Sequence, residues 1–151
     1  MNLISLLSPD RSLCAAEGGS KKRVLETLAE ALSHSGQEIS AGELFNGLIE
    51  RERLGSTGFG KGIAIPHCRL ESCTEAIAAL LKLSDGVDFD AMDDQPVDII
   101  FALVVPNEAT SEHLAILQEL AGRLDNASYR NRLRTAKTSS ELYQMAIAPL
   151  D

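Results

Sequence analysis

A histidine that follows a glycine-rich stretch is the residue of this chain best suited to do chemistry. Residues 55–69 read GSTGFGKGIAIPHCR, in which four glycines precede an apolar run, Pro66 and His67. Proline has no N–H and a fixed φ, so it restrains the backbone where the imidazole is presented. Neutral imidazole is available near pH 7 and forms covalent intermediates. These residues predict that His67 is a nucleophile, and a P–N bond formed there would suit a relay.

Other interpretations of His67 stay open. A metal site would use the nearby Cys68 and Cys73, but no C-x-x-C or H-x-x-x-H pattern accompanies them. A hydrogen-bonded core histidine is the usual state of an isolated His. No metal site is therefore predicted, and Cys68 is interpreted as a packing residue.

The glycine stretch also resembles a phosphate-binding P-loop. Gly55, Gly60 and Lys61 fit G-x-x-x-x-G-K, but Gly62 stands where the Ser or Thr hydroxyl should be. A predicted helix precedes the loop and a strand follows it, which reverses the usual strand–loop–helix order. The pattern therefore disfavours a nucleotide-dependent kinase, and the structural alternative is a tight, closely packed loop.

Three further polar features carry alternatives. His113 begins the helix after the most apolar strand, where neighbouring strands could bring it to His67, although capping or surface exposure is the alternative. His34 is expected at a helix end. The basic residues Lys21, Lys22 and Arg23 occupy the first turn of a helix, the wrong end for its dipole, and are either a solvated face or a contact to an anion or partner.

The elements that position these residues follow from periodicity and capping signals. Ser20 is the expected N-cap of the first long helix, Ser40 and Glu43 form a capping box for the second, and Gly55 ends it. The predicted elements are a helical turn at 1–7, helices at 20–34, 40–53, 111–124, 128–136 and from 139, strands at 13–16, 63–65, 76–83 and 97–105, and a loop at 87–92. The predicted inward positions are Leu44, Phe45, Leu48, Ile49, Leu114, Leu117, Leu120, Leu142, Met145 and Ala146.

Composition bounds the class of protein. A chain of 151 residues that mixes helices and strands predicts a single α/β domain, residues 1–151, with helices covering a central sheet. A net charge of −8 argues against nucleic-acid and anionic-membrane partners. No signal-like N-terminus and no apolar run of the ~20 residues that a membrane helix needs is present. Three cysteines in such a chain indicate a reducing cytoplasm.

Several motifs, in order along the chain, resemble one bacterial family. GSTGFGKGIAIPH, preceded by Arg51-Glu52, resembles the enzyme IIA components of the fructose–mannitol class of the phosphotransferase system. SKKR at 20–23, QPVD at 95–98, FALVVP at 101–106 and ELYQ at 141–144 resemble the nitrogen-regulatory members more specifically. The resemblance covers almost the whole chain and implies a central mixed β-sheet flanked by α-helices.

The resemblance also implies roles for individual residues. His67 would be phosphorylated on Nε2 by a histidine phosphocarrier protein, and His113 would support the phosphoryl group. Arg51 would balance the charge of its oxygens, and the hydroxyls of Ser56 and Thr57 would donate hydrogen bonds. No cofactor or metal is implied, because the donor already carries an activated group. Cys68 departs from the glycine that many members carry at that position.

The function implied is that of a phosphotransferase with a regulatory role. Its phosphorylation state would control partners such as sensor kinases or potassium transporters, in nitrogen- and potassium-related regulation. One alternative is a sugar-specific enzyme IIA that passes the phosphoryl group to a transporter IIB unit. Another is a binding module without transfer chemistry, which the presence of both His67 and His113 disfavours.

Overall fold

A six-stranded mixed sheet forms the centre of the computed structural model, which describes residues 3–108 and 110–150. The strands are β1 (Ser12–Glu17), β2 (Gly58–Gly60), β3 (Ile63–Ala64), β4 (His67–Leu70), β5 (Ile77–Val87) and β6 (Val97–Pro106). Their order is β1-β5-β6-β3-β2, and β4 also pairs with β6. The β5–β6 and β2–β3 pairs are antiparallel and the others are parallel. The predicted α/β class with a mixed sheet is confirmed.

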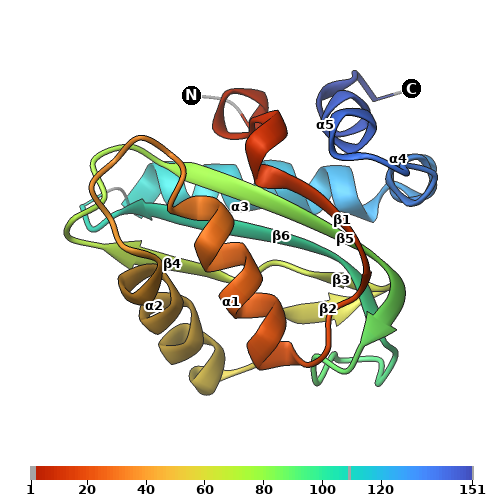
Figure 1. Ribbon diagram of the computed structural model, residues 1–151, viewed down its shortest axis with the longest axis horizontal. Coiled ribbons are helices and arrows are strands. Elements are labelled where there is room, and N and C mark those ends of the chain that lie inside the picture. The colour runs from red at the N-terminus through yellow and green to blue at the C-terminus, as the bar shows by residue number, and fades with distance from the viewer. Residues whose placement is uncertain (1–2, 109, 151) are drawn as a thin grey trace.

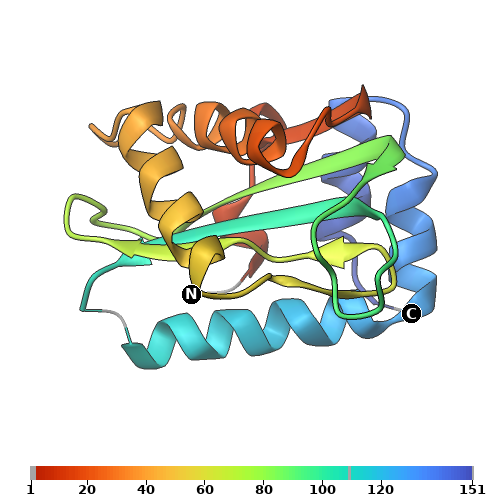
Figure 2. The same ribbon diagram turned by 90° about the horizontal axis from the view of Figure 1, so that it is seen from below.

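Helices cover both faces of this sheet (Figures 1 and 2). One face packs against α1 (Lys21–Leu32) and α2 (Ala41–Leu54), and the other against α3 (Thr110–Asp125), α4 (Ala127–Arg134) and α5 (Ser139–Ile147). Two short 3-10 helices, η1 (Leu3–Leu6) and η2 (Pro9–Arg11), precede β1. Successive residues of β5 and β6 enter opposite cores, as the neighbours Ile100 and Phe101 do. Burial on both faces explains the continuous apolar runs.

The chain around His67 pairs with β6 through two short parallel strands, β3 and β4. In β3, Ile63 pairs with Ile99, and in β4, His67 pairs with Leu103, so both strands lie along the same edge of β6. Residues 65 and 66 separate the two strands, and the Pro66 carbonyl accepts a hydrogen bond from the Leu103 N–H at 2.9 Å. The backbone next to the imidazole is thereby held by a central strand.

The predicted elements are present with some altered bounds. Ser20 and Ser40 cap α1 and α2 as predicted, but the Glu43 carboxylate bonds the Ser72 hydroxyl, so the reciprocal half of the capping box is not seen. Residues 1 and 2 of the predicted N-terminal turn lie outside the described residues. None of the helices in the described part of the chain has the length and apolar character that a membrane crossing requires.

Two predictions about the sheet and its helices were wrong. The strand predicted to end before Ser84 continues through Val87, because its backbone still pairs with β1 at Asp85 and with β6 at Val87 although Ser84, Asp85 and Gly86 are exposed. Leu114 was expected in the core but is 57% exposed. The helix is turned so that His113, rather than Leu114, takes the inward position one turn before Ile116.

The inward positions of the other helices are confirmed in part. Leu44, Leu48, Leu120, Leu142 and Ala146 are buried as predicted. Four further predicted positions are only partly buried against the two cores, namely Phe45, Ile49, Leu117 and Met145. These four lie at the edges of the apolar faces, where the helix turns toward solvent.

A pair of glycine substitutions tests the tight turn before β3. Gly62 has φ +81°, and a Cβ there would collide with Arg134 and Asp98, which form an ion pair at 2.9 Å. Gly62→Ala should therefore lower the free energy of unfolding by more than about 1 kcal/mol. Gly122, in exposed helix, has nothing within 4 Å of an added Cβ, and Gly122→Ala should raise that free energy by about 0.5–1 kcal/mol. Urea unfolding measures both, and changes of the same sign would contradict this account.

Candidate active site

His67 is the first residue of β4, and one of its ring nitrogens already makes a hydrogen bond. Its Nδ1 lies 2.8 Å from the carbonyl oxygen of Ile65. A carbonyl can only accept a hydrogen bond, so Nδ1 carries the proton and Nε2 keeps its lone pair. The half-buried ring therefore presents Nε2 as the nucleophilic atom.

The surroundings of His67 keep the ring neutral. Burial is the main effect that lowers the pKa of His67, and the charges of Arg51 and Arg69 lower it further. The Ile65 hydrogen bond and the charge of Glu52 raise the pKa but do not outweigh burial. A neutral imidazole at neutral pH is the state that can attack a phosphorus atom.

His113 lies beside His67, as the sequence predicted it could. The two ring centroids are 5.4 Å apart, with the planes inclined by 66°. The His113 side chain is buried, and its Nδ1 has no hydrogen-bond partner. Burial and the neighbouring His67 and Arg69 lower the pKa of His113. An uncommitted polar atom in a buried ring is costly unless a ligand satisfies it.

His67 lines two hollows, and the other predicted site residues are distributed between them. His113 and Arg69 line one of about 480 Å³, together with part of α2. Ser56 and Thr57 line the other, of about 260 Å³. Among the described residues, only His67 and Arg51 line both hollows. Arg51 also donates from Nη1 to the Gly55 carbonyl at 3.0 Å, which ties the guanidinium to the start of the glycine loop.

The two predicted hydroxyls are already engaged in the structure. Ser56 Oγ donates to the Phe89 carbonyl at 2.6 Å and accepts from the Gly58 N–H at 3.0 Å. Thr57 Oγ1 lies 2.7 Å from Glu52 Oε2, so its proton goes to that carboxylate. Both residues line the hollow beside His67, but neither hydroxyl has a proton free for a ligand. Their geometry supports shaping of the loop more directly than hydrogen bonding to a phosphoryl group.

Two charged residues near His67 were not singled out from the sequence. Arg69 lies two residues after His67 in β4, and the period of two in a strand places both side chains on the same face. Glu52 is buried and follows Leu44 and Leu48 at intervals of four, so helical periodicity places it on the inward face of α2. Spacing thus carried a signal for both, but Arg69 is exposed and is easily taken for a solvated surface charge. A charged residue such as Glu52 is seldom assigned to a buried face.

Cys68 and Lys61 have structural roles. Cys68 is buried in the core under α2, where an added Cβ on Gly47 would lie 3.0 Å from its sulfur. Burial raises the pKa of the Cys68 thiol to about 12, so it stays protonated, as expected of a packing residue. Lys61, the lysine of the apparent P-loop, pairs with Asp125 at 2.9 Å.

Within residues 3–108 and 110–150, no three His, Cys, Asp or Glu side chains form a group able to hold a metal ion.

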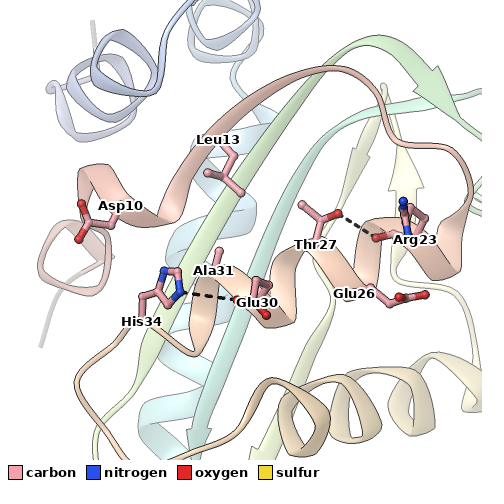
Figure 3. A pocket seen from close by; sticks show the side chains of 8 residues that line it. All are labelled: Asp10, Leu13, Arg23, Glu26, Thr27, Glu30, Ala31 and His34. Carbon is pink, nitrogen blue, oxygen red and sulfur yellow. Dashed lines mark hydrogen bonds and ion pairs between the residues drawn. The ribbon is translucent and has the colours of Figure 1, made fainter.

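A separate hollow of about 440 Å³ lies between α1 and β1 (Figure 3). Figure 3 shows His34 directed at Glu30, with which it pairs at 3.7 Å, while Thr27 Oγ1 donates to the Arg23 carbonyl at 3.0 Å. His34 lies just beyond the end of α1, close to the predicted helix end. None of the predicted phosphotransfer residues lines this hollow, so it is distinct from the site around His67.

Comparison with known proteins matches the chain to one family. Residues 5–147 match the family described as the phosphoenolpyruvate-dependent sugar phosphotransferase system, EIIA 2. A nitrogen regulatory protein from Pseudomonas aeruginosa is 51% identical over 147 residues, which are 97% of this chain and 96% of the relative. One from Escherichia coli is 40% identical over 146 residues, 96% of this chain and 89% of the relative.

A solved structure agrees with the sequence relatives. The crystal structure of the nitrogen regulatory protein IIA-Ntr from Neisseria meningitidis superposes with a TM-score of 0.88 at 37% identity, covering 95% of this chain and 98% of that one. The fold and the sequence thus agree on the family. The chain belongs to the EIIA 2 family of phosphotransfer domains and, within it, to the nitrogen-regulatory proteins.

Proposed function

We propose that this chain accepts a phosphoryl group on Nε2 of His67 from a histidine phosphocarrier protein, and that its phosphorylation state controls regulatory partners. The observation that carries the proposal is the bond from Nδ1 to the Ile65 carbonyl at 2.8 Å, which leaves Nε2 free beside His113. We further propose that the chain acts as a single domain, since all its helices pack on one sheet. The cytoplasmic location expected from the cysteine content stays a prediction.

The proposed reaction is an in-line transfer between two imidazoles. The lone pair of His67 Nε2 forms the new N–P bond while the N–P bond of the donor phosphohistidine breaks and its electron pair returns to the donor ring. The His67 ring gains positive character as the bond forms, and the Ile65 carbonyl stabilises the Nδ1–H that carries it. Phosphoryl transfer depends chiefly on positioning and on charge stabilisation, which these groups supply.

Cationic and imidazole groups around His67 fit the phosphoryl oxygens. Burial lowers the pKa of His67 most, and the nearby charges of Arg51 and Arg69 lower it further. The same positive charges would favour the phosphorylated state. The His113 ring, 5.4 Å away, would meet the oxygens of a phosphoryl group on His67 and give its uncommitted nitrogen a partner. Ser56 and Thr57 would contribute through the loop backbone rather than through their hydroxyl protons.

The surroundings of the site are suited to docking of a protein donor. Leu54, Phe59 and Leu114 are 85%, 39% and 57% exposed. Leu54 and Phe59 each line a hollow that contains His67, and Leu114 follows His113. Apolar side chains around a polar centre are typical of a protein contact surface. Exposure of Leu114 thus follows from the same helix rotation that directs His113 inward.

The alternative proposal differs in where the phosphoryl group goes next. A sugar-specific enzyme IIA would pass it to a transporter IIB unit, whereas a regulator would change its affinity for targets such as sensor kinases or potassium transporters. The regulatory proposal is favoured because nitrogen regulatory relatives are 51% and 40% identical to this chain over almost all of its length. Onward transfer to an isolated IIB unit, without any change in affinity for regulatory targets, would favour the alternative.

Mass spectrometry after incubation with a phosphorylated histidine phosphocarrier protein tests the proposed function. We expect one acid-labile phosphate on the intact chain and none on His67→Ala. His113→Ala should slow uptake by about 10-fold to 100-fold, since one hydrogen bond to a charged group contributes roughly 1.5–3 kcal/mol. The matched control is His34→Ala, which removes an exposed histidine that lines the separate hollow between α1 and β1 and should leave uptake unchanged. Phosphate retained by His67→Ala, or uptake from ATP alone, would contradict the proposal.

The lowered pKa values predict how acid affects the site. We expect NMR titration of the His67 and His113 rings to give midpoints below about 6.5, the ordinary value for histidine, so transfer should persist into mildly acidic solution. In the unfolded chain both rings take up protons as the pH falls through about 6.5, whereas the folded chain does so only at lower pH. Their contribution to stability is thus complete above that pH and is lost below it. A midpoint at or above 6.5 for His67 would contradict this account.

A further inference from the structure

We propose that Glu52 is a positioning residue for His67. Its buried carboxylate anchors Thr57, and through Thr57 and Ile65 it fixes which nitrogen of His67 is free to react. The positional part of this inference concerns the resting protein, whereas its consequence for transfer rests on the function proposed above.

The Glu52 carboxylate is buried and fully engaged. Its residue is 5% exposed, and its oxygens accept the Thr57 N–H at 2.8 Å and the Thr57 hydroxyl at 2.7 and 3.0 Å. Lys21 Nζ lies 3.3 Å from Oε1 and balances the charge. A buried carboxylate is tolerated only with such partners, because its desolvation alone costs several kcal/mol. A side chain held by two donors of one neighbouring residue and by one cation has little freedom to move.

Two more hydrogen bonds lead from Thr57 to the reactive ring. The Thr57 carbonyl accepts the Ile65 N–H at 3.1 Å, and the Ile65 carbonyl accepts the His67 Nδ1–H at 2.8 Å. At Thr57 and at Ile65 the N–H and the C=O belong to different peptide groups. These hydrogen bonds therefore fix the position of the His67 ring, but they do not polarise one another along a continuous chain. The other side of this segment is held by β6, since the Pro66 carbonyl accepts from Leu103.

The first turn of α1 completes the anchor. Besides Glu52, Lys21 Nζ lies 3.6 Å from Asp90 Oδ2 and 4.9 Å from the centre of the Phe89 ring. The Phe89 carbonyl in turn accepts from Ser56, the residue before Thr57. Of the three basic residues at the start of α1, Lys21 is thus the one that contacts the loop of the site. The contact to an anion that the sequence left open is internal, with Glu52 and Asp90.

A purely structural role for Glu52 would lower stability without changing the His67 ring. A positioning role changes the ring itself, because loss of the anchor lets Ile65 move and weakens the bond that keeps the proton on Nδ1. The 15N chemical shifts of the two ring nitrogens distinguish these roles in the protein without phosphate. They report which nitrogen carries the proton when the ring is neutral.

The test compares four variants labelled with 15N in the histidine rings, at pH 8. Lys21→Met with Glu52→Met removes the anchor without leaving a lone buried charge, and Thr57→Val removes only the hydroxyl contact. Both should shift His67 toward the form protonated on Nε2 and slow phosphoryl uptake, by about 10-fold to 100-fold for a displacement near 1 Å. Thr57→Ser should restore the wild-type shifts and rate. The matched control is Glu26→Gln, which changes an exposed carboxylate on α1 and should alter neither.

The outcomes separate this inference from the proposed function. Wild-type ring shifts in the folded double variant, with circular dichroism as the control for folding, would overturn the positioning role even if uptake remains normal. If the double variant does not fold, unchanged shifts in Thr57→Val would overturn it. Altered shifts together with no uptake by the wild-type protein would instead support the positioning role and reject the phosphotransfer function.

Discussion

The hydrogen bond from His67 Nδ1 to the Ile65 carbonyl, 2.8 Å long, is the constraint on which the site depends. It is made within three residues, so it needs no distant partner, but it requires a fixed backbone at Ile65 and Pro66. Pairing of Pro66 with β6 fixes one side, and the contact of Ile65 with Thr57 fixes the other. The backbone beside the His67 ring is thus held by the central sheet on one side and, through Thr57, by the buried Glu52 on the other.

The same constraint explains features that are unfavourable for stability alone. A buried carboxylate, a buried imidazole nitrogen without a partner and exposed Leu54 and Leu114 each cost free energy in a free protein. All of them lie around His67 or hold its loop. The imidazole nitrogen and the two leucines are accounted for if a phosphoryl group and a docked donor protein satisfy them during function. The carboxylate, already engaged by Thr57 and Lys21, is accounted for if it holds the loop. The rest of the described chain is packed on two conventional apolar cores.

Most of the fold was predictable from the sequence because apolar periodicity, capping serines and glycine stops all agree with it. The strand that runs on through Val87 was underestimated because backbone pairing with β1 and β6 continues where the side chains have become polar. At the start of α3 the inward position was misplaced by one residue, because His113 takes the buried place that Leu114 would fill by hydrophobicity. Position in the chain indicated His67 and His113, and the family resemblance indicated Arg51. The engaged hydroxyls of Ser56 and Thr57 and the anchor at Glu52 depend on contacts between segments, which spacing alone does not reveal.

The central claim is that the Ile65 carbonyl holds the proton on Nδ1 and so directs chemistry to Nε2. The most direct measurement is the phosphorus–nitrogen coupling in phosphorylated protein whose histidine rings carry 15N. We predict that phosphorus couples to Nε2 of His67, with a proton still on Nδ1. Coupling to Nδ1 would contradict the account, because phosphorus can occupy that position only if the bond to Ile65 is absent.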